Sequence, residues 1–345
     1  MFDHPSFDAH EGVHAFHDPD SGLKCIIAIH STALGPSAGG CRMWNYASGA
    51  DMVTDALRLS HGMSYKSAVA GIPLGGGKAV IWGDPRKDKS RDLFLAFGRA
   101  IDSLAGRYYT AEDVGIDVAD IEIAGEVTRY VAGLNTGSAA GGDPSPVTAK
   151  GVFLGVKAAA ARAFGSDDLA GRTIAVQGVG SVGGYLCEHL ADAGARLVIA
   201  DVDTAALETI AKKTGATIVP PAEIYDVEAD IFSPNALGAI INPGTLPRLR
   251  AKVIAGAANN QLSTPEMGTA LRDAEILYAP DYVINGGGII NVAAEISGTY
   301  DPAWVDQKLE TLIATLGQVL DDALKTHTPT HEVADAIAQA RIAAA

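Results

Sequence analysis

The glycine-rich segment at residues 178–183 constrains the fold of this chain more than any other feature. Gly178, Gly180 and Gly183 form the pattern GxGxxG, directly after the apolar run RTIAVQ and directly before a segment with helical periodicity. In such a strand–turn–helix, the first glycine permits a tight turn, the second lets a pyrophosphate approach the backbone, and the third permits close helix–strand packing. The phosphates then face the helix N-terminus. The segment therefore predicts a Rossmann-type dinucleotide-binding domain.

The strand after this turn indicates which dinucleotide is bound. RLVIADVD reaches Asp201, 23 residues after Gly178, close to the spacing of the acid that hydrogen-bonds a ribose 2′-hydroxyl. A carboxylate at this position repels a 2′-phosphate, and no Lys or Arg follows it before Lys212. We therefore expect NAD rather than NADP, with Asp203 as the alternative acid.

Two lysines lie in an almost wholly apolar segment, SYKSAVAGIPLGGGKAVI, at residues 64–81. Lys66 is near its start, and Lys78 follows three glycines that leave the backbone open to close approach. A buried ammonium needs an anionic partner, or its pKa falls until the amine is usable as a base. Strand-end lysines with their heads in water are the simpler alternative. Two such lysines in one segment favour an active site.

Carboxylate and amide side chains follow other predicted strands. TAEDVGID places Asp113 between a strand-like RYYTA and a glycine, where it could pair with a lysine. AGAANNQL places Asn259 and Asn260 after an apolar strand, at the edge of a nucleotide-binding sheet where ligands collect. For the two asparagines, a simple turn is the alternative.

Length, charge and cysteine content limit the class of protein. A chain of 345 residues with 48% hydrophobic residues exceeds what one core usually supports, which favours two domains. The net charge of −15 argues against partners such as nucleic acid or an anionic membrane. Three widely spaced cysteines, and an N-terminal segment without the apolar core of a signal peptide, predict a cytoplasmic protein.

Strand and helix patterns alternate along the chain, beginning with the buried strand LKCIIAI at 23–29. The Gly-, Ser- and Pro-rich segment 133–146 is the candidate linker. We therefore predict an α/β fold of two domains across a cleft. The N-terminal substrate and catalytic domain would comprise residues 1–137 plus about 325–345, and the Rossmann-type NAD-binding domain residues 138–324.

Three histidines near the N-terminus, His10, His14 and His17, have spacings that could place them on one helix face. The surrounding sequence, DAHEGVHAFHDPDSG, is more typical of a polar edge strand and turn, and neither cysteine partners nor an HExxH pattern accompany it. We therefore predict no metal site.

Taken together, these segments resemble the glutamate/leucine/phenylalanine/valine dehydrogenase superfamily, most closely its leucine, phenylalanine and valine branch. The resemblance covers nearly the whole chain and rests on ALGPSAGGCRMW, GMSYKSAVAGIPLGGGKAVI, TAEDVG, GVGSVG, AGAANNQL and APDYVINGGGIINVA, in the order of the family. It implies a homo-oligomeric enzyme that catalyses NAD-dependent, reversible oxidative deamination of an apolar L-amino acid to its 2-oxo acid and ammonia.

The resemblance also implies roles for individual residues. Lys78 and Asp113 match the catalytic lysine and the catalytic carboxylate. The residues expected to bind the substrate carboxylate are Lys66, the backbone at Gly39 and Gly40, and Asn260. The residues expected to line the cofactor are Thr148, Gly178, Val179, Gly180, Ser181, Val182, Gly183, Asp201, Ala236, Leu237, Ala257, Ala258 and Asn259.

The implied side-chain pocket has walls at Ala111, Ile289 and Val292 and contains no basic residue, which disfavours glutamate. Its aliphatic character favours leucine, valine or isoleucine. Phenylalanine or another aromatic amino acid is the alternative, because one methylene in a pocket changes the preference by only about 1–3 kcal/mol.

An alternative from a different class is a catalytically inactive NAD-binding regulatory protein, since a fold alone does not establish activity. The intact set of Lys66, Lys78, Asp113 and Asn260 argues against it. An amine dehydrogenase would lack the carboxylate-binding pair of Lys66 and Asn260.

Overall fold

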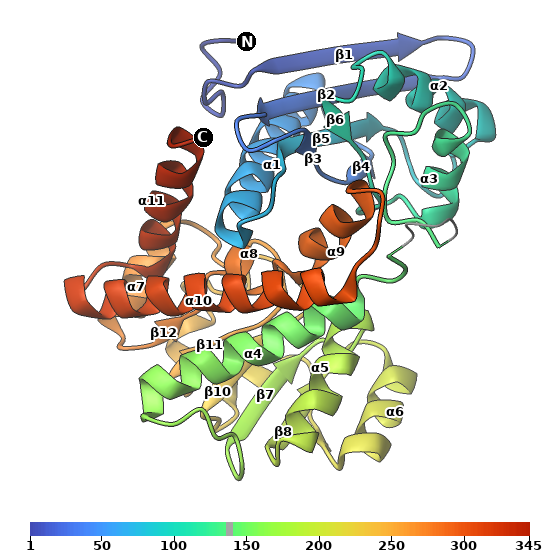
Figure 1. Ribbon diagram of the computed structural model, residues 1–345. Helices are drawn as coiled ribbons and strands as arrows, with labels where there is room; N and C mark the ends of the chain where they lie inside the picture. The colour runs from blue at the N-terminus through green and yellow to red at the C-terminus, as the bar shows by residue number, and fades with distance from the viewer. Residues whose placement is uncertain (136–140) are drawn as a thin grey trace. The chain divides into compact units, whose positions relative to one another are not determined.

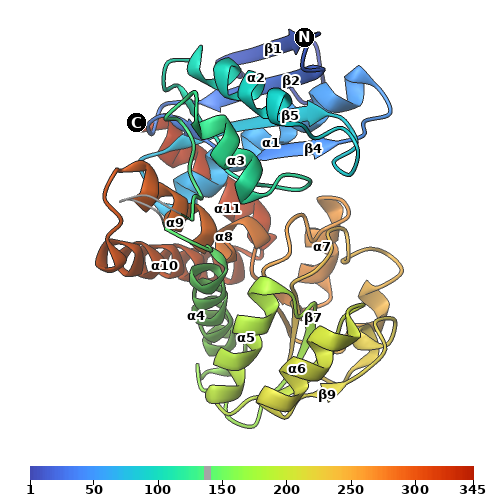
Figure 2. The ribbon, with the colours of Figure 1, turned by 90° about the vertical axis from the view of Figure 1, so that its right-hand side faces the viewer.

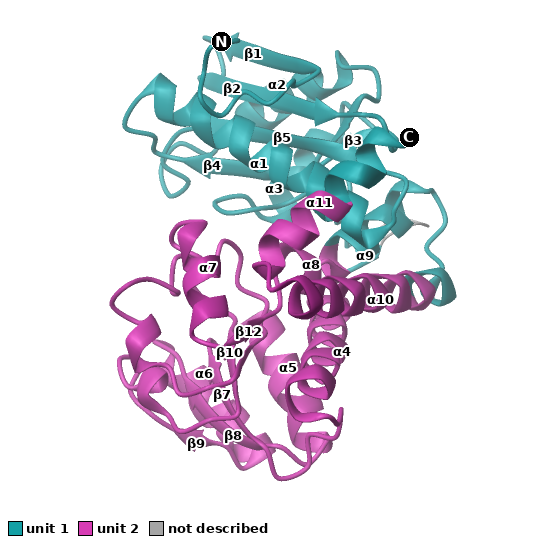
Figure 3. Ribbon diagram, turned by 90° about the vertical axis from the view of Figure 1, so that its left-hand side faces the viewer, with its two compact units in different colours: residues 1–143, 289–305, 338–345 teal, residues 144–288, 306–337 magenta. Residues whose placement is uncertain are grey.

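The computed structural model describes residues 1–135 and 141–345, and the chain divides into two compact units (Figures 1 and 3). Unit 1 comprises Met1–Asp143, Ile289–Val305 and Ala338–Ala345, and unit 2 comprises Pro144–Gly288 and Asp306–Ile337. The domain boundary predicted at 137/138, within the predicted linker, lies outside the described residues. That boundary and the predicted cleft stay predictions.

Unit 1 is built on a mixed sheet. Its strands are β1 (Gly12–Asp18), β2 (Leu23–Ser31), β3 (Ser37–Ala38), β4 (Cys41–Trp44), β5 (Gly75–Trp82) and β6 (Tyr108–Tyr109). The spatial order is β1-β2-β5-β3-β6, and β4 also pairs with β5. The pairs β1–β2 and β2–β5 are antiparallel, whereas β3 and β4 run parallel to β5. The polar segment around the three histidines therefore forms an edge strand, as predicted.

Helices cover both faces of this sheet. They are α1 (Gly49–Ala70), α2 (Arg91–Asp102) and α3 (Val118–Gly125). On β2, the side chains of Cys25 and Ile27 pack with α2 and α3, whereas those of Ile26 and Ala28 pack with α1. Because successive strand residues point to opposite faces, burial on both faces explains the unbroken apolar run of this strand. Figure 2 shows α2 and α3 with the strands of unit 1.

The three glycines of β5 are packed against protein rather than open to a ligand. A Cβ atom on Gly76 would lie 2.0 Å from the backbone nitrogen of Ser64 on α1. On Gly75 it would lie 2.0 Å from the Ser31 carbonyl oxygen, and on Gly77 it would lie 2.7 Å from the Tyr108 ring. The close approach expected at these glycines is therefore made by protein, because they let α1 and the neighbouring strands pack closely on β5.

The C-terminal end of the chain supports α1. Within α11 (Thr330–Ala343), Arg341 Nη1 donates hydrogen bonds of 2.9 Å to the carbonyl oxygens of Ala68 and Val69. Gln339 donates one of 2.7 Å to the Tyr65 hydroxyl. The last carbonyl groups of a helix have no partner inside it, so Arg341 satisfies two of them at the end of α1.

Unit 2 contains a fully parallel sheet with the order β12-β11-β10-β7-β8-β9. Its strands are β7 (Thr173–Gln177), β8 (Arg196–Ala200), β9 (Thr217–Ile218), β10 (Ile231–Pro234), β11 (Val253–Ile254) and β12 (Leu277–Tyr278). Numbered from β7, this is the 3-2-1-4-5-6 order of a dinucleotide-binding sheet. The α/β fold class and the Rossmann-type unit are therefore confirmed.

The helices of unit 2 include α5, which follows the glycine turn and packs on α4 and α6 (Figure 2). The helices that lie wholly in unit 2 are α4 (Ser145–Phe164), α5 (Ser181–Asp192), α6 (Thr204–Thr214), α7 (Glu266–Asp273) and α8 (Asp281–Ile284). Most of α10 (Pro302–Thr326) and of α11 also belongs to unit 2. Helix α9 (Gly287–Ile296) begins in unit 2 and continues in unit 1. Short 3-10 turns lie at Ile224–Asp226 and Leu246–Arg248. Among the described helices, none is both long and apolar enough to cross a membrane.

We expect Gly76→Ala to destabilise unit 1, because the new Cβ atom would meet the α1 backbone, which cannot rotate away as a side chain can. Overpacking of this kind costs about 1–3 kcal/mol. The midpoint of thermal unfolding should fall relative to the unmodified protein. The matched control is Gly62→Ala in α1, where a Cβ atom would meet nothing within 4 Å and should stabilise the helix. Equal midpoints for the two variants would contradict the packing argument.

Candidate active site

The structure brings Lys78 and Asp113 together in unit 1. Lys78 lies on β5 with only 7% of its side chain exposed, and its Nζ atom lies 2.5 Å from Asp113 Oδ2. Asp113 follows β6 in a turn in which the Ile116 amide donates to the Asp113 carbonyl oxygen. The pairing considered from the sequence is thus present as a largely buried ion pair.

A second cation, which the sequence analysis missed, also faces Asp113. Arg42 lies on β4, and its Nε atom is 3.6 Å from Asp113 Oδ2. Its Nη1 atom is 3.1 Å from Asp55 Oδ2, which in turn accepts a 2.6 Å hydrogen bond from the Tyr46 hydroxyl. Arg42 is paired in register with Val80 of β5, so these two side chains lie on the same face of the sheet. Lys78 is two residues from Val80 on the same strand, so its side chain lies on that face as well. The sequence contains no signal for that register.

These charges determine the ionisation of Asp113. Burial alone would raise its pKa, but the neighbouring Lys78 and Arg42 outweigh burial and hold the pKa of Asp113 below its ordinary value. The adjacent Glu112 behaves differently, because burial and the carboxylates around it raise its pKa. At neutral pH Asp113 is therefore ionised, with Lys78 and Arg42 beside its carboxylate.

Lys66 belongs to the same layer of unit 1. It is half-buried on α1, and α1 packs on β5 with the Ser64 backbone against Gly76. Val80 packs with α1, and Lys78, two residues before it, points to the same face. Both lysines of the apolar segment therefore lie in unit 1, with Lys78 on the face of β5 that α1 covers and Lys66 half-buried on α1.

The backbone at Gly39 and Gly40 shapes the surroundings of Asp113. The Gly39 amide donates to the Tyr109 carbonyl oxygen, and the Gly39 carbonyl oxygen accepts a 2.6 Å hydrogen bond from the Tyr108 hydroxyl. A Cβ atom on Gly40 would lie 2.8 Å from Asp113 Cβ, so only glycine lets the two segments lie this close. Tyr108, which the sequence analysis did not single out, also accepts a hydrogen bond from the Ala79 amide, next to Lys78.

The residues expected to form the side-chain pocket are held in unit 1 by a buried glutamate. Ile289 is buried and Val292 is half-buried on α9. Glu295, further along this helix, accepts hydrogen bonds from the amides of Gly133 and Leu134 at 2.8 and 3.1 Å. The preceding Ala132 amide donates to Thr110, the neighbour of Ala111. Glu295 therefore ties α9 to the chain that runs beside Ala111, and the sequence analysis missed it.

In unit 2, the glycine turn has the geometry of a phosphate cradle. Gly178 has φ +93°, and a Cβ atom there would lie 2.8 Å from the Ala236 Cβ atom. A Cβ atom on Gly183 would lie 2.1 Å from the Gly178 carbonyl oxygen, whereas one on Gly180 would meet nothing within 4 Å. Ser181 and Val182 open helix α5, so its N-terminal amides lie beside the open space. The turn therefore fits a dinucleotide pyrophosphate.

The acids after β8 have different contacts. Asp201 accepts hydrogen bonds from the amides of Val179 (2.7 Å) and Asp203 (3.0 Å), which fixes the carboxylate beside the glycine turn. Asp203 instead caps α6 and accepts from two amides of that helix. The choice of Asp201 over Asp203 as the ribose-binding acid stays a prediction. A hollow of about 460 Å³, lined by Val179, Gly180, Ser181 and Asp203 among others, adjoins the turn.

The other segments expected to line the cofactor follow β10 and β11. Leu237 is exposed beside Ala236, and Asn260 is exposed with φ +51°. The Ala257 amide donates to Asn235 Oδ1, and the Ala258 amide donates to the Pro234 carbonyl oxygen. Asn259 Oδ1 accepts a hydrogen bond from Asn285 Nδ2. Asn235, Asn285 and the buried Gln261, which donates to the carbonyl oxygens of Gly256 and Ala258, were missed by the sequence analysis.

Thr148 is buried near the start of α4, where its hydroxyl donates a 2.9 Å hydrogen bond to the Pro144 carbonyl oxygen. A Cβ atom on Gly288 would lie 3.1 Å from that hydroxyl, so the glycines at the start of α9 pack closely on α4. The expected contact of Thr148 with the nicotinamide stays a prediction.

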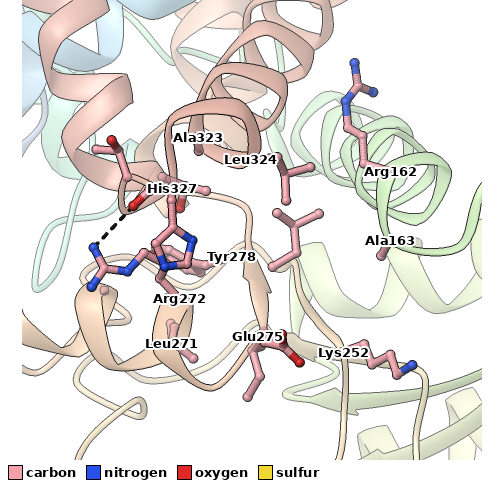
Figure 4. Close-up of a pocket in the computed structure, with 15 residues that line it drawn as sticks. Arg162, Ala163, Lys252, Leu271, Arg272, Glu275, Tyr278, Ala323, Leu324 and His327 are labelled. Atoms are coloured by element: carbon pink, nitrogen blue, oxygen red, sulfur yellow. Dashed lines mark hydrogen bonds between the residues drawn. The ribbon is translucent and has the colours of Figure 1, made fainter.

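A separate pocket of about 430 Å³ in unit 2 contains none of the predicted site residues (Figure 4). Two of its basic side chains are already paired, Arg162 with Asp321 and Arg272 with Asp273. Arg272 also donates to the His327 carbonyl oxygen. We therefore do not assign the chemistry to this pocket.

Comparison with known proteins identifies the family. Residues 10–130 match the family model described as Glu/Leu/Phe/Val dehydrogenase, dimerisation domain. Residues 142–207 and 199–345 match the model described as Glutamate/Leucine/Phenylalanine/Valine dehydrogenase.

Individual relatives agree with these matches. The chain is 52% identical to a leucine dehydrogenase of Geobacillus stearothermophilus, over 94% of this chain and 88% of the relative. It is 46% identical to a phenylalanine dehydrogenase of Bacillus thermotolerans, over 92% and 82% of the two chains. The crystal structure of L-tryptophan dehydrogenase from Nostoc punctiforme superimposes with a TM-score of 0.85 at 42% identity, covering 97% of this chain and 96% of the other.

The paired Lys78 and Asp113, the dinucleotide-type glycine turn and the family matches agree, and the chain belongs to the Glu/Leu/Phe/Val dehydrogenase family of amino acid dehydrogenases.

Proposed function

We propose that this chain catalyses the NAD-dependent, reversible oxidative deamination of an aliphatic L-amino acid, with leucine preferred, to its 2-oxo acid and ammonia. The buried contact between Lys78 and Asp113 carries this proposal, because it places a proton-transferring amine and carboxylate side by side. The relatives named leucine dehydrogenase, at 50–52% identity, support the choice of leucine.

Each residue has a defined task in the proposed reaction. Lys66 binds the substrate carboxylate, with Asn260 as a second contact. An oxidised nicotinamide held by the residues of unit 2 would supply the hydride acceptor for the substrate Cα, and the substrate would then be an imino acid. Lys78, as the neutral amine, takes a proton from the water that attacks this imino carbon. Asp113, which is ionised at the start, takes a proton from the substrate ammonium group before the oxidation. It then returns this proton to the nitrogen of the carbinolamine, which collapses to the 2-oxo acid and ammonia.

The aliphatic preference rests on the walls expected for the side-chain pocket. Ile289, Val292 and Ala111 carry no polar group, and Glu295 uses both carboxylate oxygens on backbone amides rather than facing a substrate. A glutamate side chain would find no cation among these residues. Aromatic substrates are the second candidate, because relatives named phenylalanine dehydrogenase and L-tryptophan dehydrogenase are 46% and 44% identical to this chain.

We infer NAD rather than NADP from the charges around the glycine turn. Asp201 is held beside the turn by the Val179 amide, where its charge would repel a 2′-phosphate. The nearby Lys213 is already paired with Glu188 at 2.7 Å. In the proposed division of labour, unit 1 binds the substrate and unit 2 binds NAD.

We also propose that the protein is a cytoplasmic homo-oligomer. The three cysteines are buried and unpaired, which suits a reducing compartment. The family model that matches residues 10–130 is described as a dimerisation domain, and β1 forms an edge of the unit 1 sheet. An edge strand offers backbone groups to a second copy of the chain.

We expect a substrate panel to give the highest kcat/KM for leucine with NAD⁺, followed by isoleucine and valine. Phenylalanine and tryptophan should be lower by about tenfold or more, since pocket contacts of this size discriminate by about 1–3 kcal/mol. Steady-state rates with glutamate and with NADP⁺ complete the measurement. A preference for glutamate would contradict the pocket argument, and activity with none of these amino acids would contradict the proposed function.

We expect Lys78→Ala to lower kcat by about 10²–10⁴, the usual contribution of a general acid–base group. The matched control is Lys87→Ala, because Lys87 is 78% exposed and forms a surface ion pair with Asp84 at 3.3 Å. Circular dichroism and NAD binding should be preserved in both variants. A near-normal kcat for Lys78→Ala would remove Lys78 from the mechanism.

We expect Arg42→Met to shift the acidic limb of the pH–rate profile for leucine to higher pH. Arg42 helps to hold the pKa of Asp113 below its ordinary value, so its loss raises that pKa, and the ionised carboxylate then forms only at higher pH. In Arg42→Lys, which keeps the positive charge, the acidic limb should lie closer to its position in the unmodified protein. An acidic limb at the same pH in all three proteins would show that Arg42 does not act through Asp113.

A further inference from the structure

A cluster of metal-ligating side chains lies in unit 1, at a place that the N-terminal histidine spacing did not predict. His14 and His17 are on the edge strand β1, three residues apart, so they point to opposite faces of the sheet. The cluster instead consists of Asp8 from the N-terminal segment, His30 from β2 and His61 from α1. We propose that Asp8, His30 and His61 bind a divalent transition-metal ion of the zinc type.

The distances within the cluster suit a tetrahedral ion. Asp8 Oδ2 lies 3.3 Å from His61 Nε2 and 3.6 Å from His30 Nε2, and one ligand atom from each residue lies within 4.8 Å of the others. Ligand atoms held about 2.0–2.1 Å from zinc in a tetrahedron are about 3.4 Å apart. Only the distance between the ring nitrogens of His30 and His61 would have to change for Asp8, His30 and His61 to bind one ion.

Neighbouring groups orient two of the ligands. His30 Nδ1 is 2.8 Å from the Ser64 hydroxyl, which directs Nε2 toward Asp8. His10 Nδ1 accepts a hydrogen bond from the Asp8 amide, while its Nε2 atom contacts the Leu57 carbonyl oxygen. Groups of this kind fix the orientation of metal ligands and are part of a working site. His10 therefore positions the Asp8 segment and is not itself a proposed ligand.

The cluster borders open space. A hollow of about 380 Å³ lies beside the cluster and is lined by Asp8, His30 and Tyr65 among others. An ion could therefore enter, with water completing its coordination.

The donor set also indicates which ions bind. Two imidazoles with one carboxylate suit zinc and its first-row neighbours, whereas magnesium and calcium prefer oxygen ligands throughout. A bound ion would link the N-terminal segment, β2 and α1. Because α1 also carries Lys66, five residues after His61, the ion would stabilise the helix that is proposed to bind substrate.

The proposal is tested on the full chain after treatment with a chelator and dialysis. Isothermal titration with ZnCl₂ gives stoichiometry and affinity, and the visible absorption of added Co²⁺ reports tetrahedral coordination. The variants are Asp8→Ala and His61→Ala, with His17→Ala as the matched control because His17 is an exposed histidine outside the cluster. Asp8 has 64% of its side chain exposed, so Asp8→Ala should fold normally even if His61→Ala does not.

We expect one Zn²⁺ per chain, with affinity lowered at least tenfold in Asp8→Ala and His61→Ala and unchanged in His17→Ala. Zinc should raise the unfolding midpoint of the unmodified chain and of His17→Ala, because an ion that binds only the folded state stabilises it. Mg²⁺ should have no such effect. The proposal is overturned if zinc does not bind at one ion per chain, or if Asp8→Ala binds it as tightly as the unmodified chain does.

Discussion

The buried contact between Lys78 and Asp113 is the interaction on which the arrangement of unit 1 depends. Taking two charges out of water is costly, and their attraction offsets that cost only when they are close and their surroundings are polar enough. Here Arg42 supplies a second cation, and Gly40 lets the Asp113 segment approach the strand. The glycines before Lys78 let α1 pack closely on β5, with the Ser64 backbone against Gly76.

In unit 2, the corresponding constraint is the reversal of strand order between β7 and β10. The glycine turn after β7 and the loop after β10 meet there, with Gly178 against Ala236. Parallel strands end at the same edge of a sheet, so loops that are far apart in sequence gather at one ligand site. The hydrogen bonds of Asn235, Asn285 and Gln261 then hold these loops in shape.

The Asp8, His30 and His61 cluster extends this arrangement to the N-terminal segment. Two of its members belong to elements of the catalytic layer, β2 and α1, and the third comes from a segment that contributes no strand or helix before residue 12. Arg341 and Gln339 support α1 from the other end of the chain. Both terminal segments of the chain therefore contact the helix that carries Lys66.

The sequence by itself determined the α/β class, the Rossmann-type unit, the family, and the pair formed by Lys78 and Asp113. These features have local signatures, such as glycines at set spacing after an apolar strand or a lysine in apolar sequence. Only the tertiary structure decided that Arg42 faces Asp113, that Glu295 holds α9 to the backbone at Gly133, and that Asp8 meets His30 and His61. Such contacts depend on strand register and on packing between distant segments, and neither is written in the local spacing of residues.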